Sequence, residues 1–455
     1  MTSRRSTRAF AFLLAPFALA APLAACGDGG SAGDDTVADA STAPTYYRDI
    51  KPIMDGKCTQ CHFDGGIAPF ALTSYDEAKA HAAEASLAVA AGLMPPWPPN
   101  PDCNQYYADR SLSAAQKELI QAWSAAGAPE GDAAHPGDPI DVERTALTRV
   151  DVRIEPPTDF TPTFTAEAPD QYRCFVIPWP ADHTATEYIT GFRAVPGAAA
   201  EVHHVIAYYA APGDVATYQQ LDADEPGDGY TCFGGPGGPS RGEWLGGWAP
   251  GSAGSDYEPG TGLKIEPGAA VILQVHYNGL NVLDTGALPD RTAVEFKVDP
   301  TVEREAMIMP WANPQWLDSQ SMTIPAGDAD VMHAFQFDPT PFLTGGQGFT
   351  IYSPGLHMHN LGRRATASIV RAGGASECLL QIDDWNFHWQ GGYDLRTPVH
   401  FAPGDQLRVE CHWDNSAENQ PIIGGQQQPP HDVWWGDGTT DEMCLATFYV
   451  AVDNP

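Results

Sequence analysis

The hydrophobic residues of this chain follow two different periods, one helical and one strand-like. Between residues 45 and 127, apolar side chains recur at helical spacing, with helical runs at residues 46–54 and 75–91. A third run begins at a capping box, residues 113–116, and ends at Gly127. It places four apolar side chains along one side of a helix: Leu119, Ile120, Trp123 and Ala126. This part is therefore predicted to be a small all-α domain.

The period changes from about residue 150 onward. Short alternating or β-branched runs are separated there by clusters of proline and glycine, a pattern typical of β-sandwiches and jelly rolls. About 305 residues are too many for one sandwich, so we expect two, with a break near residue 300. The strand-like runs are residues 188–190, 202–209, 270–277, 293–298, 350–352, 367–370, 406–411 and 447–452.

These patterns predict a multidomain fold, a small all-α domain followed by two all-β jelly-roll domains. A stretch rich in Gly, Ser, Asp, Thr and Ala precedes the helical domain and is typical of a flexible tether. A hydrophilic, proline-containing stretch follows that domain and indicates a linker. The predicted segments are a signal at 1–26, the tether at 27–44, the helical domain at 45–130, the linker at 131–150, and jelly rolls at 151–300 and 301–455.

The first 26 residues have the pattern of a targeting signal. Arg4, Arg5 and Arg8 precede an apolar stretch, and small residues lead up to Cys26. This resembles a bacterial lipoprotein signal, with cleavage before Cys26 and a lipid on its thiol. A simple secretory signal or a short membrane anchor are the alternatives, although the apolar stretch is short for a membrane span. We expect a protein of the bacterial cell envelope, lipid-anchored to a membrane at its periplasmic or extracellular face.

Charge limits the partners. The net charge is −34, and the acidic residues are spread along the chain. Such a chain repels the phosphate backbone, so we expect no nucleic acid partner. The excess of acidic residues is itself explained by solubility.

The sequence Cys58-Thr59-Gln60-Cys61-His62 is the attachment motif of a c-type haem. Two thioethers would hold the haem, and His62 would bind its iron. A zinc half-site or a redox CxxC are the alternatives. Met94, 32 residues after His62, is followed by two prolines and resembles the Met-Pro ligand loop of class I cytochromes c. It is the expected sixth ligand; Met54 is a rival too close to the motif, and core packing is the other explanation for Met94. Residues 45–130 are thus predicted to be a cytochrome c domain with one covalent haem c.

Six cysteines remain once Cys26, Cys58 and Cys61 are assigned. An even number in an oxidising compartment allows up to three disulfides. The six are Cys103, Cys174, Cys232, Cys378, Cys411 and Cys444.

Histidines and a methionine in the β-rich part suggest copper. His357 and His359 are two apart after a strand-like run, so both imidazoles leave one face and reach one ion. Met443 lies in a later β-rich segment, and its soft sulfur favours Cu(I). His203 and His204 are adjacent and point to opposite strand faces, so a shared ion requires a bulge or an irregular strand end.

His276 is the natural third partner of His203 and His204, although a lone strand histidine is more often a core residue. The other histidines are left as ordinary surface or core residues, since nothing local organises them: His81, His135, His183, His333, His388, His400, His412 and His431.

Four motifs in this order resemble the copper type II, ascorbate-dependent monooxygenases, the family of peptidylglycine hydroxylating monooxygenase and dopamine β-monooxygenase. The resemblance covers roughly residues 150–455 and rests on residues 202–205, 273–277, 357–362 and 441–444. It implies two jelly rolls facing each other across a solvent cleft, with two copper ions. The first would hold an electron-storing copper on His203, His204 and His276. The second would hold the oxygen-activating, catalytic copper on His357, His359 and Met443.

The resemblance also implies the disulfides Cys174–Cys232 and Cys411–Cys444, which leaves Cys103 and Cys378 by elimination. In the peptide-hydroxylating members an arginine, an asparagine and a tyrosine hold the substrate carboxylate. This sequence has Gly355, Leu445 and Thr447 at those positions, so peptide amidation is not expected.

The leading hypothesis is a copper monooxygenase that hydroxylates a C–H bond of a small-molecule substrate with O2. The fused haem would supply electrons, in place of or beside an external reductant such as ascorbate or a redox protein. The alternative is a haem and copper lipoprotein that transfers electrons or handles copper without hydroxylase activity. A zinc hydrolase on the same histidines is disfavoured, because a thioether is a poor zinc ligand and the sequence has no HExxH motif.

Overall fold

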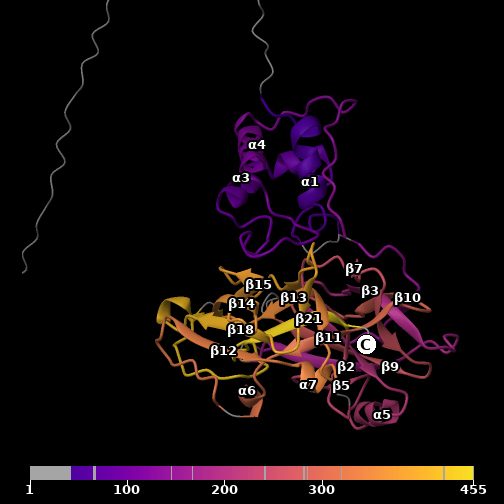
Figure 1. Ribbon diagram of the computed structural model, residues 1–455. Coiled ribbons are helices and arrows are strands. Elements are labelled where there is room, and N and C mark those ends of the chain that lie inside the picture. The colour runs from indigo at the N-terminus through magenta and orange to yellow at the C-terminus, as the bar shows by residue number, and fades with distance from the viewer. Residues whose placement is uncertain are drawn as a thin grey trace, which may run out of the picture. The chain divides into compact units, whose positions relative to one another are not determined.

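The computed structural model describes most of the chain from residue 43 onward (Figure 1). The predicted signal, its lipid-carrying Cys26 and the tether as far as residue 42 lie outside the described residues. Within the described part, no helix has the length and apolar composition needed to cross a bilayer. The described ranges are 43–64, 68–144, 146–165, 168–239, 242–279, 282–283, 285–318, 320–423 and 426–453.

The first part is helical, as predicted. Its buried core includes the fully buried side chains of Tyr46, Met54 and Trp123. The predicted capping box is present, since the Ser113 hydroxyl accepts a hydrogen bond from the backbone of Gln116. The helices are η1 (Tyr46–Ile50), α1 (Lys51–Lys57), α2 (Tyr75–Ala80), α3 (Ala82–Ala90) and α4 (Ala114–Ala125).

The run predicted as one helix over residues 75–91 is divided at His81. The His81 backbone leaves helical geometry, with ψ near 13°. Its ring stacks on Phe70 at 3.8 Å between ring centroids, and its Nδ1 lies 2.6 Å from a Glu84 carboxylate oxygen. The contacts of the His81 side chain thus favour a break in the helix, and the alanine-rich sequence does not predict this break.

The β-rich part contains every strand-like run predicted from the sequence (Figure 1). Its first half holds α5 (Val215–Ala223) and ten strands: β1 (Val152–Ile154), β2 (Asp170–Pro178), β3 (Glu187–Val195), β4 (Val202–Ala210), β5 (Tyr230–Thr231), β6 (Trp244–Trp248), β7 (Ser255–Asp256), β8 (Thr261–Ile265), β9 (Ala270–Asn278) and β10 (Ala293–Asp299).

The second half holds two short α-helices, a 3₁₀ turn and the remaining strands. The helices are α6 (Pro314–Asp318) and α7 (Thr340–Leu343), and the turn is η2 (Ala417–Asn419). The strands are β11 (Arg304–Trp311), β12 (Val331–Phe337), β13 (Phe349–His357), β14 (Gly362–Val370), β15 (Ser376–Ile382), β16 (Gly391–Gly392), β17 (Val399–Phe401), β18 (Gln406–Trp413), β19 (Ile422–Ile423), β20 (Gln426–Gln427) and β21 (Leu445–Val452).

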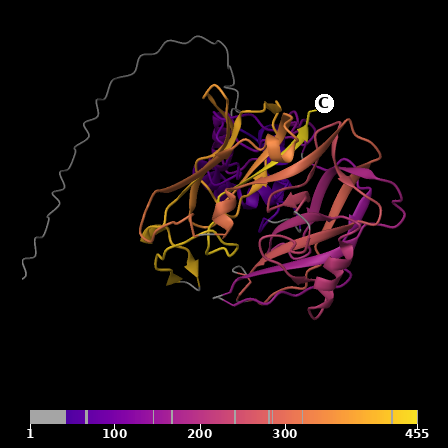
Figure 2. The same ribbon diagram turned by 60° about the horizontal axis from the view of Figure 1, so that its bottom comes forward.

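The two halves share one sheet. A five-stranded sheet, β5-β2-β9-β4-β6, belongs to the first half, and a four-stranded sheet, β12-β18-β14-β15, belongs to the second. The third large sheet has ten strands from both halves, because β8 pairs in parallel with β11, Thr261 opposite Arg304. Figure 2 shows the magenta-to-salmon strands of the first half beside the orange-to-yellow strands of the second.

The expected break near residue 300 coincides with the turn between β10 and β11, but it does not separate two independent sandwiches. The core of the first half also contains Tyr352, Tyr449 and Ala451, which come from the second half. Strand pairing across the break is long-range, so the local pattern of the sequence does not reveal it. The jelly-roll connection of each half stays a prediction.

The helical part is bonded to the second half by the disulfide Cys103–Cys378. Trp97 packs edge-on against Tyr393, with ring centroids 5.4 Å apart. The predicted linker at 131–150 has no helix or strand among its described residues, but it is packed. The Gly137 N–H donates to the Tyr47 carbonyl, and Ile140 lies against the helical core.

The other disulfides are Cys174–Cys232 and Cys411–Cys444, the pairs that the resemblance implied. Three disulfides in one chain are typical of proteins that fold in an oxidising, extracytoplasmic compartment.

Candidate metal centre

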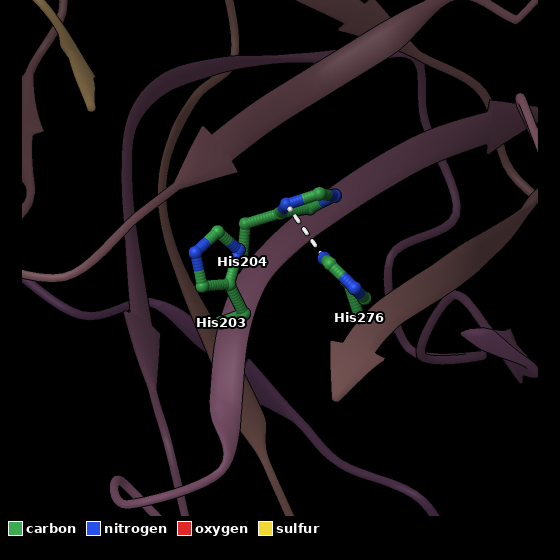
Figure 3. A group of neighbouring side chains, drawn as sticks. All are labelled: His203, His204 and His276. Carbon is green, nitrogen blue, oxygen red and sulfur yellow. Dashed lines mark hydrogen bonds between the residues drawn. The ribbon is translucent and has the colours of Figure 1, made fainter. Parts of the chain in front are cut away.

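Three histidines of the first half converge from two paired strands (Figure 3). Strands β4 and β9 run antiparallel, with His204 directly opposite His276. The register shifts between Val202 and His204, so His203 is the extra residue of a bulge. The bulge that a shared ion requires is therefore present, and it turns two adjacent imidazoles toward the same partner.

The geometry of this group suits a metal ion. One ring nitrogen from each histidine lies within 4.8 Å of the others. The Nδ1 atoms of His204 and His276 are 3.2 Å apart. Both ring nitrogens of His203 are buried and have no hydrogen-bond partner among the described residues. Buried polar atoms without partners are rare and costly, and a metal ion bound at His203 would remove that cost.

The outer nitrogen of His276 is held by Asp170. Its Nε2 lies 2.9 Å from Oδ1 of Asp170, and its ring stacks on Tyr172 at 4.1 Å. Burial alone raises the pKa of Asp170, but hydrogen bonds from His276, Thr439 and Asn278 outweigh it and lower that pKa well below its usual value. An ionised carboxylate only accepts, so Nε2 carries the proton and Nδ1 keeps a lone pair for a metal.

The second set lies at the end of β13. His357 is the last residue of the strand, and the ring of His359 is 5.0 Å from that of His357. The Nδ1–H of His357 donates to Oε1 of Gln390 at 2.5 Å, and the Nδ1–H of His359 donates to the Asp441 carbonyl at 3.0 Å. Both Nε2 atoms are thus left as metal ligands. Burial lowers the pKa of His357 to about 4 and that of His359 to about 3, so both stay neutral at pH 7.

Met443 is presented by the segment just before β21. Its neighbour Cys444 is bonded to Cys411 of β18. Its other neighbour, Glu442, is fully buried and accepts hydrogen bonds from the backbone N–H groups of His359 and Leu361 and from the Trp413 indole. Burial raises the pKa of Glu442 to about 7. The carboxyl group thereby bonds the methionine segment to the histidine pair.

A cavity of about 310 Å³ joins the two sets. His204, His357 and Met443 all line it. The rings of His204 and His357 are 6.3 Å apart, so the two sets are close neighbours. The resemblance implied jelly rolls that face each other across a solvent cleft; the structure joins the two halves by a continuous sheet, with a lined cavity beside it.

The predicted haem-attachment motif lies in the helical part. Cys58 and Cys61 are the unpaired cysteines of the described chain. His62 is buried, and its Nδ1–H donates to the Phe70 carbonyl at 3.0 Å, which leaves Nε2 for an iron. Met54 is buried in the helical core, whereas Met94 is partly exposed. Met94 as the sixth haem ligand, with Met54 as its rival, stays a prediction.

Three supporting residues were not found from the sequence: Asp170, Gln390 and Glu442. Asp170 and Gln390 contact their histidines across 106 and 33 residues. No local pattern marks such contacts, although Glu442 lies beside Met443. His388, left unassigned, has its ring centroid 6.4 Å from that of His203. Most other histidines pair with nearby acidic groups, as His183 does with Glu187.

Comparison with known proteins supports the same class of site. Residues 317–452 match the family model of the copper type II ascorbate-dependent monooxygenase, C-terminal domain. This stretch contains His357, His359 and Met443, whereas the three-histidine group lies before it.

Among individual relatives, the chain is similar to DBH-like monooxygenase protein 2 of Mus musculus, with 31% identity over 94 residues, 21% of this chain and 13% of the relative. It is 25% identical to DBH-like monooxygenase protein 1 of Gallus gallus over 207 residues, 44% of this chain and 31% of the relative. The matched segments thus span less than a third of these relatives. Among solved structures, PNGase F aligns with a TM-score of 0.31 and 11% identity over 67% of this chain and 96% of that chain, a likeness too low to support an inference.

Proposed function

We propose that this protein is a copper-dependent monooxygenase that hydroxylates a C–H bond of a small substrate with O2. One observation carries the proposal. Two groups of buried imidazoles lie beside one cavity, and in each group a protein acceptor holds an outer ring nitrogen so that the other nitrogen is left for a metal. The family match over residues 317–452 supports copper as that metal.

His203, His204 and His276 would hold one copper, and His357, His359 and Met443 would hold the catalytic one. When bound, copper supplies one-electron redox chemistry and the activation of O2. The chain supplies the geometry. Asp170, Gln390 and the Asp441 carbonyl fix the ring tautomers, and burial keeps His357 and His359 neutral and therefore able to bind a metal at pH 7.

The cavity is where a substrate would bind. Arg144, the one arginine or lysine among the described residues that line it, is paired with Glu258 at 2.8 Å. Gly355, Leu445 and Thr447 also line it, and none of them carries a charge. A carboxylate substrate would thus lose hydration without gaining a cation, which argues against glycine-extended peptides.

Aromatic rings offer one means of binding a substrate in this cavity. Tyr257 and Tyr449 line the cavity, but their hydroxyl groups already bond to the Leu245 carbonyl and to Thr261, each at 2.7 Å. Their rings are therefore left to pack against apolar parts of a substrate.

A c-type haem on Cys58, Cys61 and His62, with Met94 as the sixth ligand, would supply electrons. The free thiols and the oriented His62 ring fit such a haem. Ascorbate or a redox protein would be the external source, and the lipid on Cys26 would hold the protein at an envelope membrane. The Cys103–Cys378 bond keeps the helical part attached to the second half.

Oxygen uptake by the full chain tests the proposal. The copper- and haem-loaded protein, given a reductant and a panel of small aromatic substrates, should consume O2 only when a substrate is hydroxylated. Met443→Ala should abolish this uptake while the haem spectrum stays unchanged. Retained turnover in Met443→Ala would refute the assigned catalytic site. Copper and haem binding without any substrate-dependent uptake would instead favour an electron-transfer or copper-handling protein.

A further inference from the structure

The side chain of Asp170 lies between the two ligand sets and is 11% exposed. Its Oδ1 accepts hydrogen bonds from His276 Nε2 and Asn278 Nδ2, each at 2.9 Å. Its Oδ2 accepts from both the backbone N–H and the hydroxyl of Thr439, at 3.1 and 2.6 Å. One carboxylate therefore contacts a ligand of the three-histidine group and a residue of the second half.

Thr439 is 2% exposed and belongs to the segment that presents Met443. Its carbonyl accepts a hydrogen bond from Nδ2 of Asn360, the residue after His359, at 2.8 Å. Thr439 is thus held on one side by Asp170 and on the other by Asn360, which adjoins the histidine pair.

The segment itself is closed by short-range hydrogen bonds. The Asp441 N–H donates to the Gly438 carbonyl at 2.9 Å, and the Gly436 N–H donates to the Glu442 carbonyl at 3.1 Å. Because these bonds make residues 436–442 a compact loop, a displacement of Thr439 also displaces the neighbouring Met443.

We propose that Asp170 is a positioning residue that couples the two metal sites through its contact with Thr439. A metal on Nδ1 of His276 holds that ring in the orientation that donates to Asp170. The Asp170 carboxylate and Thr439 are then already ordered when the second ion binds. Ordering the Met443 segment therefore costs less conformational entropy at that step. Coupling is reciprocal, and we expect each site to raise the affinity of the other on the order of tenfold. The proposal rests on the proposed function only in that both sites bind copper.

A double-mutant cycle on the full chain tests the coupling. Cu(I) is titrated without oxygen against a competing chelator, in the unaltered protein, His203→Ala, Thr439→Val and the double variant. His203→Ala removes one of the three ligands and so weakens the first site without removing a contact of Asp170, because the His203 ring nitrogens have no partner in the described structure. Thr439→Val removes only the hydroxyl and keeps both backbone contacts. The adjacent Thr440→Val is the matched control, since Thr440 is exposed.

We expect His203→Ala to weaken Cu(I) binding at the Met443 site about tenfold in the unaltered and Thr440→Val backgrounds, and by a clearly smaller factor in Thr439→Val, which keeps only the backbone bond to Asp170. The sulfur signal of Met443 in X-ray absorption should weaken in step. Thr439→Ser, which keeps the hydroxyl, should restore the coupling and guards against a folding defect of the valine variant. Equal effects of His203→Ala in all backgrounds would overturn the coupling. Absence of copper from both sites would overturn the proposed function itself.

Discussion

The two ligand sets lie side by side, but they are held by different kinds of structure. His204 and His276 are register partners in an antiparallel ladder that is unbroken from His204 to Ala210, and His203 lies in the bulge at its end. His357, His359 and Met443 come from a strand end and from a separate loop. That second set depends on side-chain contacts, chiefly Glu442 and Gln390, and on one disulfide. A ladder distributes its support over many backbone bonds, whereas the second set concentrates its support in a few side chains.

The largest effect is expected for Glu442→Ala. The substitution leaves two backbone N–H groups and the Trp413 indole N–H buried without an acceptor. We expect a loss of roughly 3–6 kcal/mol in the free energy of unfolding, measured by urea denaturation of the copper-free protein. Glu418→Ala, at an exposed position, is the control and should change little. Equal stability of the two variants would contradict the assigned role of Glu442.

Opening the disulfides compares the two sets directly. Replacing Cys411 and Cys444 by serine removes a link across 33 residues, and replacing Cys174 and Cys232 removes one across 58. Each pair should cost roughly 3–4 kcal/mol of unfolding free energy. The Cys411/Cys444 variant should lose copper at the Met443 site, because Cys444 adjoins Met443. The Cys174/Cys232 variant should keep copper at the three-histidine site, because the strand ladder still holds His204 and His276. If both variants lost the same copper, the two sets would not differ in support.

Gln390→Leu should act directly on one site. It removes the acceptor of the His357 Nδ1–H and frees the ring to rotate. We expect copper affinity at the His357 site to fall about 10- to 100-fold, measured by chelator competition, and affinity at the three-histidine site to fall by no more than the roughly tenfold coupling. Gln390→Glu keeps an acceptor and serves as the control. A loss at the three-histidine site larger than this coupling would mean that the amide supports the whole cavity.

Tyr172→Phe should have the smallest effect. It keeps the ring that stacks on His276 but removes the hydroxyl bond to the Asp437 carbonyl, which measures 2.9 Å. We expect a loss of about 1 kcal/mol in unfolding free energy, with hydrogen exchange accelerated in residues 436–442 and unchanged in β9. Faster exchange in β9 would show that the ladder also relies on this hydroxyl.

Local signals in the sequence predicted eight of the strands, among them β4, β9, β13 and β21, and the helix after Ser113. They also indicated that a shared ion needs a bulge or an irregular strand end at His203 and His204, and the structure has a bulge there. The break at His81 was missed, since it depends on stacking against Phe70.

The residues that support the metal centre could not be predicted from local sequence patterns. Asp170 contacts His276 and Thr439 across 106 and 269 residues, and strand β8 joins β11 across the break between the halves. Each of these contacts is created by the tertiary fold, so residue type and spacing carry no trace of it. The candidate ligands themselves could be proposed from the sequence, because imidazoles and a thioether are chemically distinctive.

The parallel pairing of β8 with β11 has a mechanical consequence. Thr261 to Leu263 are joined by backbone hydrogen bonds to Arg304 to Ala306, and the ten-stranded sheet continues on both sides of this junction. A hinge that moved the two halves apart would have to tear this ladder and expose the buried Leu263 and Ala306 to water. The sheet therefore fixes the distance between the two ligand sets. The loops around the cavity are the parts that must move to admit a substrate.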